Sequence, residues 1–351
     1  MRALFINTGG IGDQILLLPT VKILKTRFPA CDIDLLTEPR SVCIKELTNL
    51  YRNVKEFDFK QKNLNVLELR GLLRKHYYKY IFCTGSSYKA NFVASLGKAE
   101  YKIGFKKGIF SDLFLTHPVK LNSNQYTANM FTELLLPAIP NHNKEKNELI
   151  PEIKISPNDV AWAKDIIAPR IREKYYARKI FLHPGTSKLS IQKNILKGWG
   201  GEHWAKVIEK LLDDDKNIVI IIGGKDDEEV IKEIHKNLPY FAKPQNLFDL
   251  SRLNMNIAQL AATISFSDLL LCCDSAPMHI AVALGKKLIA FFGPTDPIKL
   301  LPRDPKFKAV YVNNLDCRPC LFDHRKESCN KPVCLDLKPE AMLETISKVL
   351  T

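Results

Sequence analysis

Residues 268–297 read DLLLCCDSAPMHIAVALGKKLIAFFGPTDP and hold a strand, a helix and a second strand in close succession. Asp268–Cys272 and Lys287–Phe291 are short apolar runs, which is typical of strands that are buried on both faces. Pro277–Leu284 lies between them, and Pro277 suits the first turn of a helix. Two strands joined through a helix pair in parallel. The stretch therefore predicts a parallel sheet covered by helices, the α/β class.

The same alternation occurs in both halves of the 351-residue chain. Other apolar runs of strand length are Arg2–Asn7, Asp32–Thr37, Tyr80–Thr84, Lys179–Leu182 and Asn217–Ile222. Other stretches with helical spacing are Gln14–Arg27, Glu202–Leu212 and Pro339–Leu350. A segment from about Ile139 to Asp159 has the Asn, Lys, Glu and Pro content of a linker. We therefore expect two Rossmann-like domains, residues 1–155 and 156–351, which face each other across a cleft, with a terminal helix free to pack back on the first domain.

The composition is that of a globular protein, with 46% hydrophobic and 26% charged residues. The formal net charge of +14 favours an anionic partner. The chain has no aromatic-studded basic motif and no zinc-finger spacing, which argues against nucleic acid and favours anionic lipid or glycolipid. The alternative is a basic protein whose charge only keeps it soluble.

The sequence gives no sign of a membrane span or a signal peptide. No apolar run reaches the roughly 18 residues that cross a bilayer. The N-terminus, MRALFINTGGIGD, fits a buried first strand better than a leader, because it has no small-residue cleavage site. Most of the five cysteines outside the C-terminal region lie in apolar contexts, which favours a reducing compartment. We therefore expect a cytoplasmic protein.

The first polar motif, Thr8-Gly9-Gly10-Ile11-Gly12-Asp13, follows the first predicted strand directly. Glycines at a strand-to-helix turn let the backbone approach a ligand and leave helix N–H groups pointing at it. The spacing is not a dinucleotide fingerprint, because the final glycine is missing. Asp13 is either the N-cap of a plain tight turn or a general base at the edge of a cleft.

The second motif, His183-Pro184-Gly185-Thr186-Ser187, follows the first predicted strand of the second domain. Lys197-Gly198-Trp199 comes shortly after it. Small residues, hydroxyl groups and a lysine at such a turn suit a phosphate-bearing ligand. The alternative is a polar loop with a solvated lysine.

The third motif begins at Asp274, which ends a buried strand, and Ser275 can cap the helix that follows. The neighbouring strand ends at Gly293-Pro294-Thr295. Ligands of open α/β sheets bind at such carboxyl ends, where a helix N-terminus can hold a diphosphate. His279, one turn into this helix, would brace the loop or contact the ligand, although a lone histidine is more often a core residue.

Four further cysteines lie in a Pro-rich stretch without strand character: Cys317, Cys320, Cys329 and Cys334. The two-residue gap between the first two suits a tetrahedral metal site. Structural zinc or iron, reduced thiols and disulfides are all compatible with this pattern.

The order TGGIGD, HPGTS, KGW, DSAPMH and GPTDP resembles that of the lipopolysaccharide heptosyltransferases, glycosyltransferase family nine. The resemblance runs from Arg2 to about Pro297. It implies the GT-B architecture and transfer of heptose from ADP-heptose, with inversion and without a catalytic metal or other cofactor. The acceptor would be an anionic lipopolysaccharide inner core at the cytoplasmic face of the inner membrane. The alternatives are a relative with another nucleotide sugar or acceptor, a dehydrogenase-like nucleotide-binding protein and a non-catalytic glycan-binding relative.

The resemblance also implies roles for single residues. Asp13 would be the base, Lys197 would contact the donor phosphates, and Asp274 would contact the heptose. The other residues expected to line the donor site are Thr186, Ser187, Ser275, His279, Gly293 and Thr295. The residues expected at the acceptor loop are Thr8, Gly9, Gly10 and Gly12. The lysines expected to favour the anionic acceptor are Lys89, Lys98, Lys102, Lys106 and Lys107.

Overall fold

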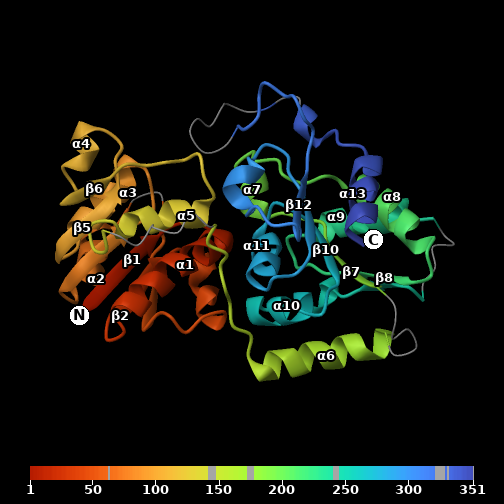
Figure 1. Cartoon of the computed structure of the whole chain (residues 1–351), viewed down its shortest axis with the longest axis horizontal. Helices are drawn as coiled ribbons and strands as arrows, with labels where there is room; N and C mark the ends of the chain where they lie inside the picture. The colour runs from red at the N-terminus through yellow and green to blue at the C-terminus, as the bar shows by residue number, and fades with distance from the viewer. Residues whose placement is uncertain are drawn as a thin grey trace. The chain divides into compact units, whose positions relative to one another are not determined.

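The computed structural model describes residues 1–61, 64–140, 148–171, 178–239, 245–320, 329 and 332–350. The chain divides into two compact units, Met1–Lys154 and Ile155–Thr351 (Figure 1). This division lies one residue from the predicted boundary. None of the helices in the described ranges is long and apolar enough to cross a membrane.

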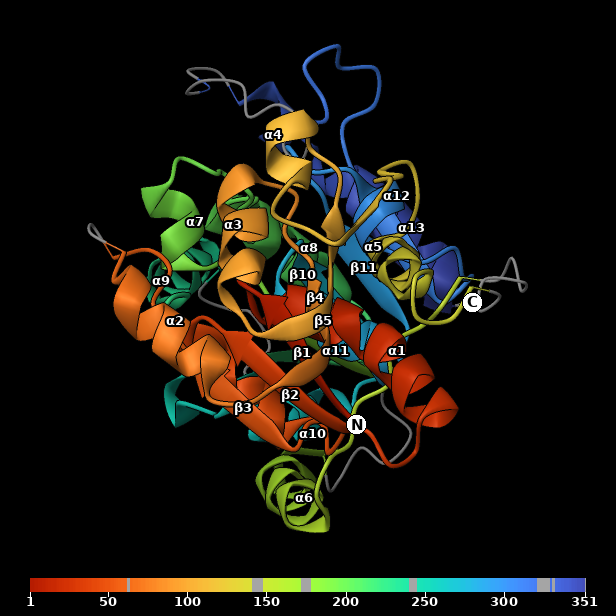
Figure 2. The same ribbon diagram turned by 90° about the vertical axis from the view of Figure 1, so that its left-hand side faces the viewer.

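The first unit contains a sheet of six parallel strands in the order β3-β2-β1-β4-β5-β6. The strands are β1 (Arg2–Asn7), β2 (Asp32–Thr37), β3 (Asn53–Glu56), β4 (Tyr78–Cys83), β5 (Ala99–Phe105) and β6 (His117–Val119). The helices are α1 (Ile11–Arg27), η1 (Pro39–Glu46), α2 (Val66–Arg74), α3 (Tyr88–Leu96), α4 (Ile109–Asp112), α5 (Thr127–Thr132) and η2 (Glu133–Leu135). Helices α1 and α5 contact each other on one side of the sheet, and α2 and α3 on the other (Figure 2).

The second unit repeats this plan, with six parallel strands in the order β12-β11-β10-β7-β8-β9. The strands are β7 (Arg178–His183), β8 (Asn217–Ile221), β9 (Leu247–Asp249), β10 (Leu269–Cys273), β11 (Leu288–Phe291) and β12 (Phe307–Val310). The α-helices are α6 (Pro157–Ile171), α7 (Lys188–Gln192), α8 (Gly201–Leu212), α9 (Glu228–Asn237), α10 (Ile257–Ile264), α11 (Ala276–Ala283), α12 (Pro297–Leu300) and α13 (Pro339–Leu350). The short 3-10 helices are η4 (Ser251–Leu253) and η5 (Val333–Leu335). The predicted α/β class with parallel sheets is confirmed.

One predicted helix start is wrong. Helix α1 begins at Ile11 rather than Gln14, so Gly12 and Asp13 belong to its first turn. The predicted terminal helix is present as α13, and its apolar side chains Met342 and Ile346 join the core of the second unit that also holds Trp204 of α8. The amphipathic pattern predicted this helix but not the surface that it covers.

The parallel pairing brings the predicted motifs to one edge of each sheet. All strands of a parallel sheet run in the same direction, so the carboxyl ends of neighbouring strands lie side by side. We call this row of strand ends the carboxyl edge of the sheet. In the first unit, the glycine turn follows β1, the strand that pairs with β2 on one side and β4 on the other. In the second, the loops after β7, β10 and β11 carry the other motifs. Each unit thus presents its polar loops at its carboxyl edge.

Candidate active site

Asp13 lies in the first turn of α1, where its Oδ2 atom accepts a hydrogen bond from the Gly10 backbone N–H at 2.8 Å. Gly9 has no room for a side chain, because a Cβ atom there would lie 2.3 Å from the same oxygen. Asp13 is partly exposed. Asp13 thus stands at a helix N-terminus, a place that favours negatively charged side chains. Asp13 therefore closes the turn and is also accessible to a substrate.

Buried polar side chains that the sequence analysis missed hold this turn in place. The Gln14 Nε2 atom donates to the Asn7 carbonyl oxygen at 3.0 Å and to the Thr37 hydroxyl oxygen at 2.9 Å. The Ser41 hydroxyl donates to the Gly9 carbonyl oxygen at 3.0 Å. Thr37 and Ser41 stand at and just beyond the end of β2, the strand beside β1. Their position at the carboxyl edge was the signal that could have identified them.

Three motifs of the second unit meet at Asp274. Its Oδ2 atom accepts hydrogen bonds from the Lys197 Nζ atom and from the Thr295 hydroxyl, both at 2.7 Å. The Asp274 side chain is 3% exposed and that of Lys197 is 20% exposed. Burial opposes ionisation of this carboxyl, but the charge and hydrogen bond of Lys197, with His279 and the Thr295 hydroxyl, hold its pKa below the usual range. Asp274 is therefore ionised, and it fixes the Lys197 ammonium group at the carboxyl edge.

The backbone behind Lys197 is anchored in the core. Trp199 is buried, its ring stacks on Phe291 with centroids 5.4 Å apart, and it meets Trp204 edge-on at 4.7 Å. Its Nε1 atom donates to the Leu337 carbonyl oxygen at 2.9 Å. Rigid support of this kind fixes the backbone from which the Lys197 side chain extends.

Helix α11 begins directly after Asp274. Ser275 is its N-cap residue, but the predicted side-chain cap is wrong, since the Ser275 hydroxyl donates to the Cys273 carbonyl oxygen at 3.2 Å. The hydroxyl thus does not occupy the first N–H groups of the helix, which can receive an anion. His279 is buried one turn into α11 and favours the ionised form of Asp274.

The loop after β7 rests on a carboxylate that the sequence analysis did not single out. The Asp227 side chain is buried, lies 3.4 Å from the His183 Nε2 atom and accepts a 2.7 Å hydrogen bond from the Gly224 N–H. A Cβ atom on Gly185 would come within 1.9 Å of the Asp227 Oδ1 atom. Asp227 therefore joins the loops that follow β7 and β8, and it requires glycine at position 185.

The second half of the same loop is capped in two ways. Ser187 accepts a hydrogen bond from the Ser190 N–H at 3.3 Å and so caps α7. Asp226 accepts one from the Lys188 N–H at 3.0 Å. Thr186 is buried and Ser187 is exposed. The two expected donor-site hydroxyls thus sit on a loop that Asp226 and Asp227, in the turn before α9, hold in place.

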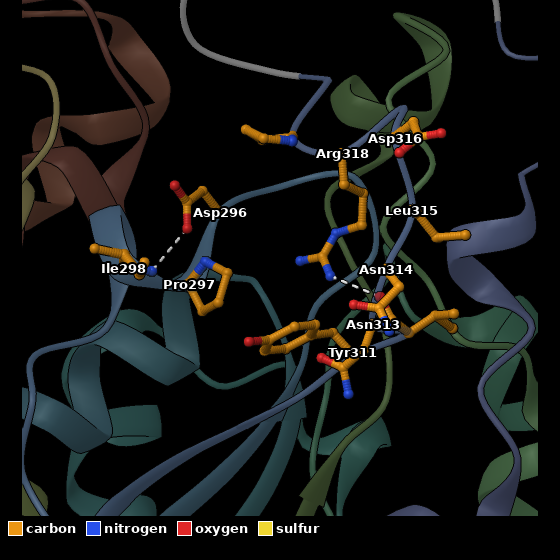
Figure 3. Close-up of a pocket in the computed structure, with 11 residues that line it drawn as sticks. Asp296, Pro297, Ile298, Tyr311, Asn313, Asn314, Leu315, Asp316 and Arg318 are labelled. Carbon is orange, nitrogen blue, oxygen red and sulfur yellow. Dashed lines mark hydrogen bonds between the residues drawn. The ribbon is translucent and has the colours of Figure 1, made fainter.

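The segment after β12 supports the Gly293–Thr295 loop through Arg318, a residue that the sequence analysis did not single out. The Arg318 guanidinium donates to the Thr295 carbonyl oxygen at 2.8 Å and to the Val312 carbonyl oxygen at 3.1 Å. It lies over the Tyr311 ring, 4.4 Å from the centroid, at a cavity of about 280 Å³ (Figure 3). Arg318 therefore fixes the backbone of Thr295, whose hydroxyl in turn bonds Asp274.

The cysteine motif lies against the same loop. A Cβ atom on Gly293 would lie 2.7 Å from a methyl group of Leu335 and 3.9 Å from the Cys334 sulfur. Burial, with the nearby thiols Cys320, Cys317 and Cys329, raises the pKa of Cys334 to about 11. All nine cysteines are free thiols in the described part of the chain. Over the same residues, no group of three or more His, Cys, Asp or Glu side chains is arranged to hold a metal ion, so the zinc or iron site stays a prediction.

The five lysines expected to favour an acceptor differ in availability. Lys89 and Lys102 donate their ammonium groups at 2.8 Å to the carbonyl oxygens of Phe59 and Ser95. Lys98 lies over the ring of Tyr77. Lys89, Lys98, Lys106 and Lys107 are exposed. Of these four, Lys106 and Lys107 have no ring contact, salt bridge or side-chain hydrogen bond with a residue that the structure describes.

Comparison with known proteins places the whole arrangement in one family. Residues 66–331 match the model of glycosyltransferase family 9 (heptosyltransferase). The lipooligosaccharide heptosyltransferase 2 of Campylobacter jejuni serotype O:6 is 28% identical over 274 residues, which are 73% of this chain and 77% of that protein. The ADP-heptose LPS heptosyltransferase II of E. coli superposes with a TM-score of 0.74 at 18% identity, over 100% of this chain and 98% of that one. The E. coli heptosyltransferase WaaC, solved with ADP, gives 0.69 at 18% identity over 99% and 100%. With its two parallel six-stranded sheets and a family match over most of its length, the chain belongs to glycosyltransferase family 9, the heptosyltransferases.

Proposed function

We propose that this heptosyltransferase moves heptose from ADP-heptose to a lipopolysaccharide or lipooligosaccharide inner-core acceptor and inverts the anomeric centre. The observation that carries the proposal is the Lys197–Asp274–Thr295 cluster at the carboxyl edge of the second sheet. It supplies a fixed cation and a hydroxyl beside the N-terminus of α11, the groups that a sugar diphosphate needs. The E. coli relative solved with ADP-2-deoxy-2-fluoro heptose supports this donor.

The donor diphosphate would bind at Lys197, the Thr186 and Ser187 hydroxyls and the N-terminus of α11. As the bond from the anomeric carbon to the phosphate oxygen breaks, negative charge grows on the leaving ADP. Groups that are already fixed by Asp274 and Trp199 need no reorganisation to stabilise that charge. Asp274 is the expected partner of the heptose hydroxyls.

Asp13 would supply the base. Its carboxylate removes the proton of an acceptor hydroxyl while that oxygen attacks the anomeric carbon from the face opposite ADP. The proton stays on Asp13, the new glycosidic bond replaces the bond to the phosphate oxygen, and ADP leaves with the bonding pair. One displacement of this kind inverts the anomeric centre. No metal ion takes part in this scheme.

Replacing Asp13 by asparagine tests the proposal. Asparagine keeps an oxygen that can accept the Gly10 N–H, so the turn should persist while the base is lost. We expect turnover to fall by about 10²- to 10⁴-fold, the usual contribution of a general base, with ADP-heptose affinity changed only a few fold. The measurement is mass spectrometry of product formed from ADP-heptose and truncated core acceptors.

Asp58→Asn is the matched control, because Asp58 is exposed and also accepts a backbone N–H, that of Lys60, at 2.8 Å. It should leave turnover unchanged. Near-normal turnover by Asp13→Asn would exclude Asp13 as the base. Product with another nucleotide sugar but none with ADP-heptose would favour the alternative, a family member with a different donor or a different glycan or protein acceptor.

A further inference from the structure

Three large apolar side chains stand almost fully in solvent on one short helix of the first unit. Ile109 is 81% exposed, Phe110 is 74% exposed and Leu113, just after α4, is 77% exposed. Single exposed apolar residues are ordinary, but three that adjoin one another mark an interaction surface. We call Ile109, Phe110 and Leu113 the tip patch. None of the roles proposed above uses it.

The tip patch is built on a fixed support. Ser111, on the same turn, is buried, and its hydroxyl oxygen accepts a 2.8 Å hydrogen bond from the Asn91 Nδ2 atom of α3. The Asp112 carboxylate accepts the Lys107 N–H at 3.0 Å. At about 100° per residue, Ile109, Phe110 and Leu113 share one side of the turn, and Ser111 points to the opposite side. The apolar side chains are thus held outward while the other side is anchored.

Positive charge adjoins the tip patch. Lys106 and Lys107 precede it, separated from Ile109 by Gly108, and they are exposed and form no salt bridge with a residue in the described ranges. Gly108, with φ +131°, lets the chain turn from β5 into α4 at this point. Apolar side chains that project beside lysines match the boundary of an anionic bilayer, where acyl chains lie next to charged headgroups. The many closely spaced negative headgroups of such a bilayer give both lysines counter-charges beside an apolar layer.

The tip patch also lies on the carboxyl edge of the first sheet, the same edge that carries Asp13, the proposed base for the acceptor hydroxyl. The segment Lys106–Leu113 follows β5, and β5 is two strands from β1 in the order β1-β4-β5. Neighbouring strands are about 4.8 Å apart, so the loop that carries Asp13 and the segment that carries the patch leave the same sheet edge roughly 10 Å apart. The tip patch and Asp13 therefore both belong to segments that follow the carboxyl ends of strands in the same sheet.

We propose that the tip patch inserts into the headgroup region of an anionic lipid bilayer and that Lys106 and Lys107 hold it there. This deepens the proposed function, because it would bring the enzyme to the surface that carries a lipid-linked acceptor. Binding itself requires neither donor nor acceptor. The two ideas can therefore fail independently.

The test is cosedimentation of the full chain with vesicles of phosphatidylcholine alone or mixed with phosphatidylglycerol, with no sugar substrate present. We expect binding to the mixed vesicles that weakens as salt rises. Replacing Ile109, Phe110 and Leu113 together by serine should reduce that binding at least tenfold. Lys106→Gln with Lys107→Gln should reduce it and flatten its salt dependence. Leu67→Ser with Tyr77→Ser is the matched control, since both side chains are exposed on the same unit, and it should bind as the native chain does.

Equal vesicle binding by the serine variant and the native chain would overturn the proposal. So would an absence of vesicle binding combined with a native dimer that becomes monomeric in the serine variant, because the patch would then contact a second copy. Turnover on a lipid-free truncated acceptor should be the same in the serine variant as in the native chain, which also shows that the variant folds. If vesicle binding behaves as expected but no heptose is transferred, the anchor stands and the proposed function fails.

Discussion

The pair formed by Lys197 and Asp274 allows a sharp prediction, because its two members are unequally buried. The Asp274 side chain is 3% exposed and that of Lys197 is 20% exposed. Lys197→Met leaves a carboxylate that cannot reach water, with only the Thr295 hydroxyl and His279 to compensate. Asp274→Asn leaves an ammonium group at the end of a flexible stem that can turn into solvent. Both substitutions break the same ion pair. Lys197→Met leaves a buried carboxylate without its counter-charge, whereas Asp274→Asn leaves an ammonium group that water can solvate.

We expect Lys197→Met to lower the free energy of unfolding of the second unit by about 3–5 kcal/mol, the cost of leaving a buried charge unpaired. Asp274→Asn should cost about 1–2 kcal/mol, since mainly a charged hydrogen bond is lost. All three tryptophans, Trp162, Trp199 and Trp204, lie in the second unit. Urea unfolding followed by tryptophan fluorescence therefore reports on that unit alone. Lys206→Met, which breaks the exposed pair with Glu202, is the control and should cause no measurable loss.

The sign of the pH dependence separates the two variants further. In the native chain the pKa of Asp274 is lowered, so its ionisation stabilises the fold above its unfolded pKa, and that contribution is lost as pH falls through the folded pKa. In Lys197→Met, the ammonium group that mainly offset burial is lost, so the pKa of Asp274 rises. The variant should then recover part of its deficit at acidic pH, because the buried carboxyl becomes neutral more readily than in the native chain. An Asp274→Asn variant that is less stable than Lys197→Met, or a deficit in Lys197→Met that does not change with pH, would refute the reasoning.

Three other predictions concern the support of the donor site. Gly185→Ala should displace the buried Asp227 carboxylate and so destabilise the second unit by about 2–4 kcal/mol. It should also weaken ADP-heptose binding, measured by calorimetry. Gly198→Ala is the control, because a Cβ atom there would meet open space, and it should change neither the stability nor the binding. Arg318→Lys should raise the KM for ADP-heptose several fold with a smaller change in kcat, because a lysine cannot bridge the Thr295 and Val312 carbonyls; an equal fall in kcat would argue against a positioning role. If the cysteine motif binds structural zinc or iron, elemental analysis of the purified chain should find it, and Cys317→Ser with Cys320→Ser should remove it.

The interior of the fold could be predicted from the sequence because central parallel strands are continuous apolar runs. Every residue of β8, NIVII, is buried, and β10 is buried throughout as well. The edge strands β3, β6, β9 and β12 escaped prediction, since they are short and partly exposed. The interior strand β5 also escaped it, because the first half of AEYKIGF is polar and partly exposed. Their strand conformation comes from pairing with a neighbour rather than from their own composition.

The site could be predicted where a residue ends a strand, because the topology alone brings strand ends together. Asp274 and Thr295 were found in this way. Asp227 was missed because it sits in the charged run GGKDDEE, which looks like a solvated helix start, and only the packing of β7 beside β8 shows that Gly185 covers it. Arg318 was missed because its contact with Thr295 depends on the path of an irregular segment, which no periodicity encodes.

The ion pair of Lys197 with Asp274 joins residues that are 77 positions apart. The segment from Ser187 to Lys197 is a loop whose two ends are held, one by the HPGTS turn and the other by the pair with Asp274. Doubling the length of such a loop costs about 0.6 kcal/mol, which is small beside the pair that it delivers. Insertions in this segment should thus be nearly neutral in evolution, provided that the lysine and the tryptophan behind it return to their places. A motif search that fixes the number of residues between HPGTS and KGW would then overlook relatives that have the same donor site.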